Sequence, residues 1–303
     1  MKKILALIFV SLNGLAWSQQ DPMFTHYMFN TLWLNPAYAG TREAMTITGI
    51  NRSQWVGFDG APLDQSLTIH TPILNGKMGL GLSVINDKIG PVKSTIIAVD
   101  VAYHIRLTKK SKLGLGIKGL VDMYSNTISS LKINNESDPS FGQNFNKTLP
   151  NAGVGIYYYR ERFYVGVSTP QLLQNTLNGS LVSASQEQRH YYVIMGAVIP
   201  MAKNLKFKPT GFIKATAGAP IQGDITASFL MYDKFSLGAM YRTGDGVGAL
   251  IGFQFTDQFT VGYSYDYSMA NTTGKYNSGS HEVMLRYDLI YKSTRKIKSL
   301  RYF

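Results

Sequence analysis

Hydrophobic and polar side chains alternate with a period of two along most of the chain. Between positions 259 and 268, Phe, Val and Tyr side chains occupy every second position, and Thr, Gly, Ser and Asp fill the positions between them. The same alternation recurs in 97–107 and 113–123. A period of two is the signature of a β-strand whose two faces meet different surroundings. The apolar face often runs five or six positions long, as a tilted strand needs to cross a bilayer.

Segments of this kind can be marked from residue 44 to residue 291. They cover 44–56, 63–73, 77–87, 94–107, 112–125, 150–160, 162–169, 189–200, 204–216, 222–232, 234–242, 246–256, 258–268 and 281–291. Their number, about 14, is even, as bacterial single-chain barrels show. The sequence therefore predicts an all-β protein, a transmembrane antiparallel β-barrel of about 14 strands over residues 44–291.

Short and longer connections alternate between these segments along the chain. Every second one is short: 74–76, 108–111, 161, 201–203, 233 and 257. Several of the others are longer: 57–62, 88–93, 126–149, 170–188 and 269–280. Short periplasmic turns and longer outer loops are the asymmetry of outer-membrane barrels, and a soluble β-sandwich has no reason to show it. We therefore expect a protein of the outer membrane with both termini in the periplasm.

The first 18 residues have the features of a secretory signal. Met1-Lys2-Lys3 is followed by an apolar run from Ile4 to Leu15 and then by Ala16-Trp17-Ser18, with small residues where a signal peptidase cleaves. The apolar run is shorter than the roughly 20 residues of a membrane-spanning helix. We predict a signal peptide at 1–18 and Gln19 as the first mature residue. Because the chain has no Cys, neither a lipoprotein anchor nor disulfides are expected.

Composition favours the same architecture. The chain has 19 Tyr, 15 Phe and 29 Gly, and only 16% of its residues are charged, which suits strands with aromatic girdles better than a helical bundle. The formal charge of +12 would also fit a nucleic-acid-binding protein, but an exported chain rarely meets nucleic acid. The basic residues are scattered except in the tail, 292–303, which we expect to lie on anionic lipid or an acidic partner.

Charged side chains lie on the face of the strands opposite the apolar band. They are Arg52, Asp100, His104, Lys118, Asp122, Lys206, Lys208, Lys214, Asp224, Asp266, Arg286 and Asp288. In a barrel these side chains point into the lumen. There they would either pair with one another and fill the interior or line an ion-selective pathway, and the sequence leaves both open. The second possibility motivates an alternative function as a general porin or solute channel, which single-channel conductance would test.

Sequence motifs of catalysis are weak. Gly114-Leu115-Gly116-Ile117-Lys118-Gly119 matches a dinucleotide fingerprint, but it lies inside an alternating strand and no helix follows it. The five histidines show no metal-ligand spacing, and no nucleophile elbow occurs. We therefore expect no catalytic, cofactor-binding or metal-binding residues and no cofactor. An outer-membrane hydrolase stays an alternative that needs a Ser, Asp and His set at one rim.

Residues 19–43 are rich in aromatics yet belong to no predicted strand. Tyr27, Thr31 and Leu34 recur at helical spacing, and Asn35-Pro36 should end such a helix. We expect a short amphipathic segment at the periplasmic mouth of the barrel. It would either plug the lumen or bind a partner, and the pattern does not decide between these roles.

The same segment carries a family resemblance. Asp21-Pro22-x-Phe24-x-x-Tyr27-Met28-Phe29-Asn30, followed by Asn35-Pro36-Ala37-Tyr38-Ala39-Gly40, resembles the amino-terminal pattern of the PorP/SprF family. Arg52-Ser53-Gln54-Trp55, Pro62 and the run from His281 to Asp288 also look like strands of that family. The resemblance covers the mature chain from end to end, and the Asn-Pro-Ala-Tyr-Ala-Gly run is its most specific part.

The resemblance implies an outer-membrane barrel of the type IX secretion system of Bacteroidota, without catalytic residues. Such barrels support secretion or surface attachment of exported proteins, including gliding adhesins. The expected partners are subunits of the secretion machinery, a secreted adhesin, or both, together with outer-membrane lipids and no nucleic acid. The candidate partner-binding residues are Asp21, Pro22, Phe24, Tyr27, Asn30, Asn35, Pro36, Tyr38 and Gly40.

Two features depart from the family pattern or go beyond it. The run from Lys296 to Phe303 is not explained by the motif; its terminal Phe resembles a barrel-assembly signal, but the residues before it do not alternate. If adhesin binding is the role, we expect specificity to lie in loops 126–149 and 170–188. The identity of the partner, the oligomeric state and the choice between a core secretion subunit and a dedicated adhesin partner stay open.

Overall fold

The computed structural model describes residues 22–127, 144–180, 183–269 and 278–290. The predicted signal peptide and basic tail lie outside these ranges, as do Asp21 and most of the predicted loop 126–149. The strands are β1 (Met45–Ser53), β2 (Leu63–Ile73), β3 (Met78–Ile89), β4 (Val92–Arg106), β5 (Ser111–Asn126), β6 (Phe145–Arg160), β7 (Phe163–Thr169), β8 (Thr176–Ser180), β9 (Ser183–Gln186), β10 (His190–Ala197), β11 (Ile199–Ala202), β12 (Leu205–Thr216), β13 (Gln222–Met231), β14 (Phe235–Arg242), β15 (Gly246–Gln254), β16 (Phe259–Ser268) and β17 (Ser280–Leu289).

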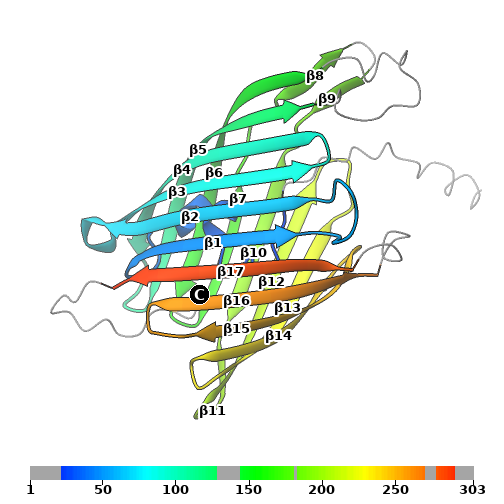
Figure 1. The fold of residues 1–303 in the computed structure, drawn as a ribbon. Helices are drawn as coiled ribbons and strands as arrows, with labels where there is room; N and C mark the ends of the chain where they lie inside the picture. Colours follow the sequence, from blue (N-terminus) through cyan, green and yellow to red (C-terminus); the bar gives the residue numbers. More distant parts are fainter. Residues whose placement is uncertain (1–21, 128–143, 181–182, 270–277, 291–303) are drawn as a thin grey trace, which may run out of the picture.

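These strands close into an antiparallel barrel (Figure 1). Neighbours in the chain pair with each other, β10 pairs with both β7 and β12, and β1 pairs with β17 at the seam that closes the ring. The short strand β11 continues β10 beyond Val198, so the two together occupy one place in the ring. Apart from the separate β8–β9 hairpin, the ring has 14 strands, as predicted, and each predicted segment coincides with one of them.

The connections sort to two ends of the barrel. The turn end carries 74–77, 107–110, 161–162, 203–204, 232–234 and 255–258. The opposite end, called the loop end, carries 54–62, 90–91, 217–221 and 243–245, and there β5 ends and β6 begins, β7 ends and β10 begins, and β16 ends and β17 begins. The expectation of a longer loop at 88–93 is wrong, because β3 and β4 continue to a turn at Gly90 and Pro91. Gly90 has φ of 55°, which a tight hairpin turn requires. The predicted loop 170–188 contains the β8–β9 hairpin, which the alternation did not reveal.

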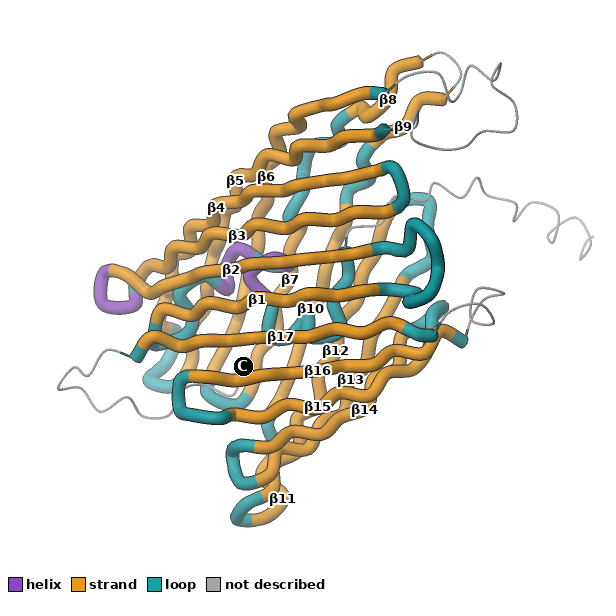
Figure 2. Tube along the Cα trace, in the orientation of Figure 1, coloured by secondary structure: helices purple, strands orange, loops and turns teal. Residues whose placement is uncertain are grey.

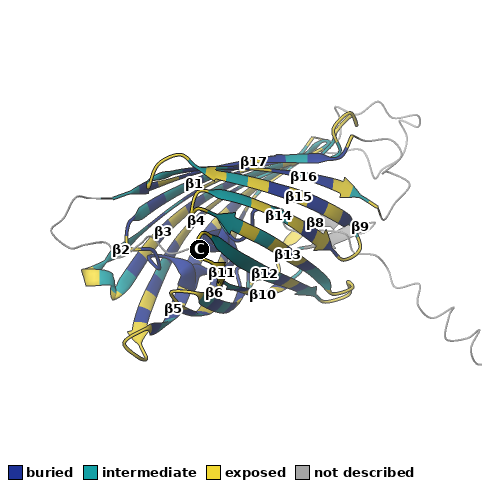
Figure 3. Ribbon diagram, turned by 90° about the horizontal axis from the view of Figure 1, so that it is seen from below, coloured by how far each residue is buried: buried dark blue, intermediate teal, exposed yellow. Residues whose placement is uncertain are grey.

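The two faces of the barrel wall differ as predicted. Outward side chains are large and apolar; Ile117 is 63% exposed and Val99 is 52% exposed. Figure 3 shows buried and exposed residues alternating along the strands. Of the charged residues predicted to point inward, all are buried except Lys206 and Lys208, which are half-buried. None of the helices in the described ranges is long and apolar enough to span a bilayer.

Residues 22–42, called the plug segment below, lie inside the ring of strands. They contain the short helices α2 (Thr31–Leu34) and η1 (Pro36–Tyr38), which Figure 2 shows within the barrel. Asn35 accepts a hydrogen bond from the Ala37 amide and begins η1, in agreement with the predicted helix end at Asn35-Pro36. From Phe24 to Arg42 every residue is buried except Phe29, which is half-buried. The segment therefore forms much of the protein's core.

Glycines on the inner wall give the backbone of the plug segment its space. A Cβ added at Gly79 would lie 2.0 Å from the Ala39 carbonyl oxygen, and one at Gly116 would lie 2.2 Å from the Ala37 nitrogen. Such contacts are far below van der Waals distance. The glycines that imitate a dinucleotide fingerprint thus lie in β5, where Gly116 allows the close approach of η1.

Replacing one of these glycines should weaken the fold. We expect Gly116→Ala to lower the free energy of unfolding by about 1–3 kcal/mol, the usual cost of overpacking a filled core. Denaturant titration in detergent micelles, followed by fluorescence of the buried Trp33, measures the change. Gly119→Ala is the matched control, since Gly119 is an exposed position on the same strand with no atom near its Cβ position. Equal effects of the two substitutions would contradict the role of Gly116.

Candidate functional site

The plug segment runs through the lumen from the loop end to the turn end. Thr25 is bonded to Glu282, near the start of β17, and Arg42 is bonded to Asp288, near its finish. Glu282 and Asp288 are six positions apart on one strand, which corresponds to roughly 20 Å along the barrel wall. The segment therefore begins and ends beside β17, at opposite ends of the barrel, before the chain enters β1 at the turn end.

A cluster at the loop end holds the beginning of the plug segment. The Glu282 carboxylate accepts hydrogen bonds from the backbone nitrogens of Thr25 and His26, each at 2.7 Å, and contacts His26 Nδ1 at 2.7 Å. Arg52 donates from Nη1 to Thr25 Oγ1 at 2.7 Å and to the Asp266 carboxylate. We call these five residues the loop-end clamp. Because all are buried, each charge depends on these partners.

A second cluster, the turn-end clamp, holds the end of the plug segment. Arg42 donates from Nε and Nη2 to the two Asp288 oxygens at 3.0 and 2.9 Å, a bidentate pair. Thr46 donates to the same carboxylate at 2.7 Å. Both clamps use residues of β1 and β17, so the plug segment binds across the seam where the first and last strands meet.

Between the clamps, side chains of the barrel wall satisfy the backbone of the plug segment. Lys118 donates to the carbonyl oxygens of Leu32 and Trp33 at 3.2 and 2.7 Å, and Ser168 donates to the Leu34 oxygen at 2.7 Å. These carbonyls belong to α2, whose last turn leaves them without intrahelical donors. Side chains of the barrel wall thus supply the hydrogen-bond donors that this four-residue helix cannot supply to its own carbonyl groups.

Aromatic contacts fill the remaining space around the plug segment. The Tyr27 hydroxyl lies 3.0 Å from Thr210 Oγ1 on β12, and its ring packs at 5.5 Å from Phe212. Tyr38 packs edge-on against His70 and Tyr157 at 5.1 and 5.5 Å. The segment is therefore held by shape as well as by charge.

The candidate partner-binding residues fall inside this arrangement. Those buried in the lumen are Phe24, Tyr27, Asn30, Asn35, Pro36, Tyr38 and Gly40; Pro22 is half-buried, and Asp21 lies outside the described residues. Asn35 also donates to the Ile156 carbonyl at 3.0 Å. Gly40 has φ of 70°, and a Cβ there would lie 2.5 Å from Gly79 Cα. The Asn-Pro-Ala-Tyr-Ala-Gly run thus fits the inner wall residue by residue.

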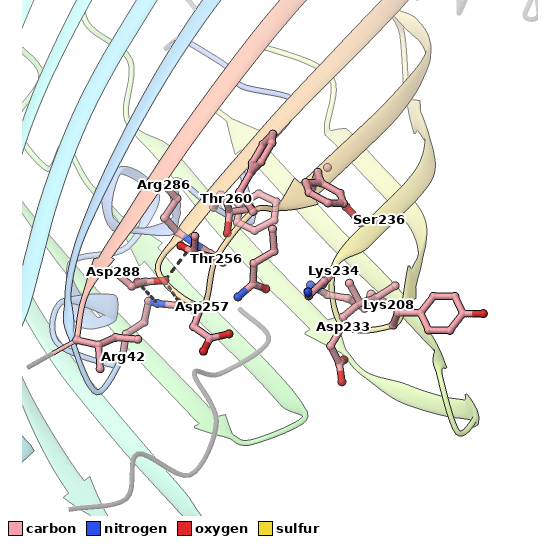
Figure 4. A pocket seen from close by; sticks show the side chains of 18 residues that line it. Arg42, Lys208, Asp233, Lys234, Ser236, Thr256, Asp257, Thr260, Arg286 and Asp288 are labelled. Carbon is pink, nitrogen blue, oxygen red and sulfur yellow. Dashed lines mark hydrogen bonds and ion pairs between the residues drawn. The ribbon is translucent and has the colours of Figure 1, made fainter. Parts of the chain in front are cut away.

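A cavity of about 570 Å³ opens between the plug segment and the strands β12 to β17 at the turn end (Figure 4). Its walls include the basic side chains of Arg42, Lys208, Lys234 and Arg286 and the ring of Phe29. The alternation placed Lys208 and Arg286 on the inner face but did not indicate Phe29 or Lys234, which are distant in sequence and meet only in the fold. Among the described residues, no group of three His, Asp or Glu side chains is arranged to hold a metal ion.

Breaking the loop-end clamp should destabilise the whole barrel. Glu282→Ala leaves the backbone N–H groups of Thr25 and His26 without their acceptor and removes one of the two carboxylates that Arg52 contacts. We expect a loss of about 3–5 kcal/mol in the free energy of unfolding. Urea titration, with folded and unfolded forms separated by electrophoresis, measures it. Val283→Ala, at the neighbouring outward position, should cost about 0.5 kcal/mol or less. A barrel as stable with Glu282→Ala as with Val283→Ala would contradict the clamp.

Comparisons with known proteins agree with the family resemblance. A family model described as type IX secretion system membrane protein PorP/SprF matches residues 16–287. No curated protein matches the chain. Among solved structures, the Acinetobacter baumannii outer membrane protein Omp33 is 10% identical with a TM-score of 0.49, over 82% of this chain and 99% of that one. A Pseudomonas aeruginosa FadL homologue is 12% identical with a TM-score of 0.46, over 92% and 97%. Likeness at this level says nothing of function.

Proposed function

The chain belongs to the PorP/SprF family of type IX secretion system membrane proteins, and from this premise we propose that it is a non-enzymatic outer-membrane barrel that supports secretion or surface attachment of a secreted protein such as an adhesin. The observation that carries the proposal is the lumen filled by the plug segment, clamped at both ends. A filled lumen favours a protein that works through its two mouths by binding partners, over a general porin.

Each mouth has a different partner in this proposal. The turn end faces the periplasm, where the secretion machinery lies, and the loop end faces outward, where a secreted protein is held. The carboxyl end of β17 is then periplasmic, as expected from sequence. The plug segment, in contrast, starts beside the loop-end clamp, on the outer side. Its direct contact with a partner would be made near Pro22 and Met23, which are half-buried, because the following residues are covered by the wall.

The loop 54–62 supports a docking role for the outer mouth. Its backbone is tied to the β16–β17 connection by hydrogen bonds between Val56 and Gly279 and between Ser278 and Val56, each 2.9 Å. On this ordered loop Phe58 is 50% exposed. An apolar side chain on a fixed loop loses little entropy on binding. The contribution of 126–149 and 170–188 to specificity stays a prediction.

The proposed orientation can be tested with single cysteines, since the chain has none of its own. Asp59→Cys lies on an exposed loop at the loop end, and Lys109→Cys lies on an exposed turn at the turn end. In intact cells, a membrane-impermeant maleimide should label only Asp59→Cys, and disrupting the outer membrane should make Lys109→Cys reactive. Labelling of Lys109→Cys alone in intact cells would reverse the orientation.

Deleting residues 21–40 should abolish surface display of the secreted partner. The deletion removes the contents of the lumen and with them the fixed shape of both mouths. Surface protein is measured by antibody binding to whole cells and divided by the amount of barrel in the outer membrane, because loss of core contacts also lowers barrel stability. Gly119→Ala, outside the lumen, serves as the control with normal display. Normal display per inserted barrel in the deletion strain would refute the role of the plug segment.

The function itself is tested by affinity capture of the tagged barrel from mildly solubilised outer membranes. Mass spectrometry should identify subunits of the secretion machinery, a large surface protein, or both, and so show which branch of the function applies. Recovery of the barrel alone under several detergents would overturn the proposal and favour a solute channel, for which conductance of the purified barrel is the next measurement.

A further inference from the structure

The cavity at the turn end is formed by parts of the chain that the clamps bring together. Phe29 and Arg42 come from the plug segment, Arg286 comes from β17, and Lys234 lies on the turn between β13 and β14. Figure 4 shows Arg42, Arg286 and Asp288 on one side and Lys208, Lys234 and Asp233 on the other. The volume of the turn-end cavity, about 570 Å³, lies within the range of sites that bind small molecules or short peptide segments.

Two of the three acidic side chains of the cavity are already engaged with basic ones. Asp288 holds Arg42 in a bidentate pair and accepts a further bond from Thr46. Asp233 pairs with Lys206, which is not part of the cavity wall. The remaining carboxylate of the wall, Asp257, is exposed. Besides Arg42, which is paired with Asp288, three basic side chains, Lys208, Lys234 and Arg286, therefore line a cavity with one further carboxylate.

Arg286 has hydrogen-bonding capacity that the protein does not use. Its Nε is buried and has no hydrogen-bond partner among the described residues. The nearest carboxylate oxygen, on Asp288, is 3.6 Å from Nε and is already bonded to Arg42. A buried donor without an acceptor is costly, and a guanidinium presents a planar fork of donors that matches a carboxylate.

Phe29 holds two of the cations against the cavity. The Arg286 guanidinium lies 4.9 Å from the centre of the Phe29 ring, and the Lys208 ammonium lies 5.8 Å from it. Cation–π attraction keeps both charges in place without supplying a hydrogen-bond acceptor. Leu230 and Ile290, both half-buried, also line the wall. A ligand that matches this wall carries both an anionic group and apolar surface.

We propose that the turn-end cavity binds a carboxylate borne by a short apolar peptide segment of a partner protein, with Arg286 as its bidentate anchor and Lys234 at the rim. This peptide site rests on the proposed secretion function in one respect only, the source of the peptide: if the turn end faces the periplasm, the peptide belongs to a periplasmic protein. Peptide binding to the purified barrel is measured without secretion, so the two proposals fail separately.

Three synthetic peptides test this site on the purified full-length barrel in detergent. They are acetyl-GSLF with a free carboxyl end, the same peptide amidated, and amidated acetyl-GDLF, whose only carboxylate is a side chain. Calorimetric titration should show the free acid binding at least about tenfold more tightly than its amide, the difference expected for a charge-assisted bidentate pair. Binding of the amidated GDLF peptide would show that a side-chain carboxylate also serves. No binding of either carboxylate peptide would overturn the proposal.

Variants locate the binding in the cavity. Arg286→Gln should weaken binding of the carboxylate peptide by about tenfold, and Lys234→Gln, on an exposed turn, should weaken it by about threefold. Lys203→Gln is the matched control, an exposed lysine at the turn end that is outside the cavity wall, and should bind as the parent does. Trp33 fluorescence verifies that each variant is folded. Binding unchanged in both Arg286→Gln and Lys234→Gln would place the peptide elsewhere.

A last variant tests whether the chain's own tail occupies the cavity, since Ile290 lies in its wall and residues 291–303 follow. A chain without 291–303 should bind the carboxylate peptide as the full chain does. Binding seen only after the truncation would assign the cavity to the tail and overturn the proposal of a partner peptide.

Discussion

The structure depends on one constraint, which is that the lumen of a 14-stranded barrel is filled by a segment of the chain whose buried backbone groups need hydrogen-bond partners. Eight strands leave an interior that side chains fill by themselves, whereas wider barrels leave a channel. Here the chain fills the space with its own plug segment. Buried backbone groups need hydrogen-bond partners. The inner wall supplies them through Glu282 and Lys118, and inner-wall glycines such as Gly116 supply the room.

The same constraint joins the filling of the lumen to the closure of the ring. Both clamps engage the strands at the seam, where β1 and β17 meet, so the polar contacts that hold the plug segment also hold the first strand near the last. Removing a charged clamp residue therefore has two effects at once: it leaves a buried charge without its partner, and it weakens the contact between the first and last strands. The clamps fix the position of the plug segment at both mouths of the barrel. At the turn end, Phe29 and Arg42 of this segment form part of the cavity wall.

Sequence reasoning recovered the features that are local in the chain. The alternation from Phe259 to Ser268 reproduces β16, because facing lipid on one side and lumen on the other imposes a period of two on any strand of the wall. It did not recover the β8–β9 hairpin or the cavity. The path of the plug segment rests on pairs such as Thr25 and Glu282, which are 257 positions apart. A periodic pattern cannot reveal a contact between residues so far apart in the chain. The glycines of β3 and β5, which lie against the plug segment, are a sequence feature that reflects its path.

The charged inner face was compatible with either a filled lumen or an ion pathway, and the contacts separate these interpretations. Arg52 is paired with Asp266, Lys118 with Asp100, and Arg242 with Asp224. These charges serve the interior of the protein, so their presence is no argument for ion flow. Arg286 differs, because its buried Nε has no hydrogen-bond partner among the described residues and its side chain lines the turn-end cavity. This unused donor is the basis of the proposed peptide site at the turn end, and such a site would suit a barrel that acts by binding partners.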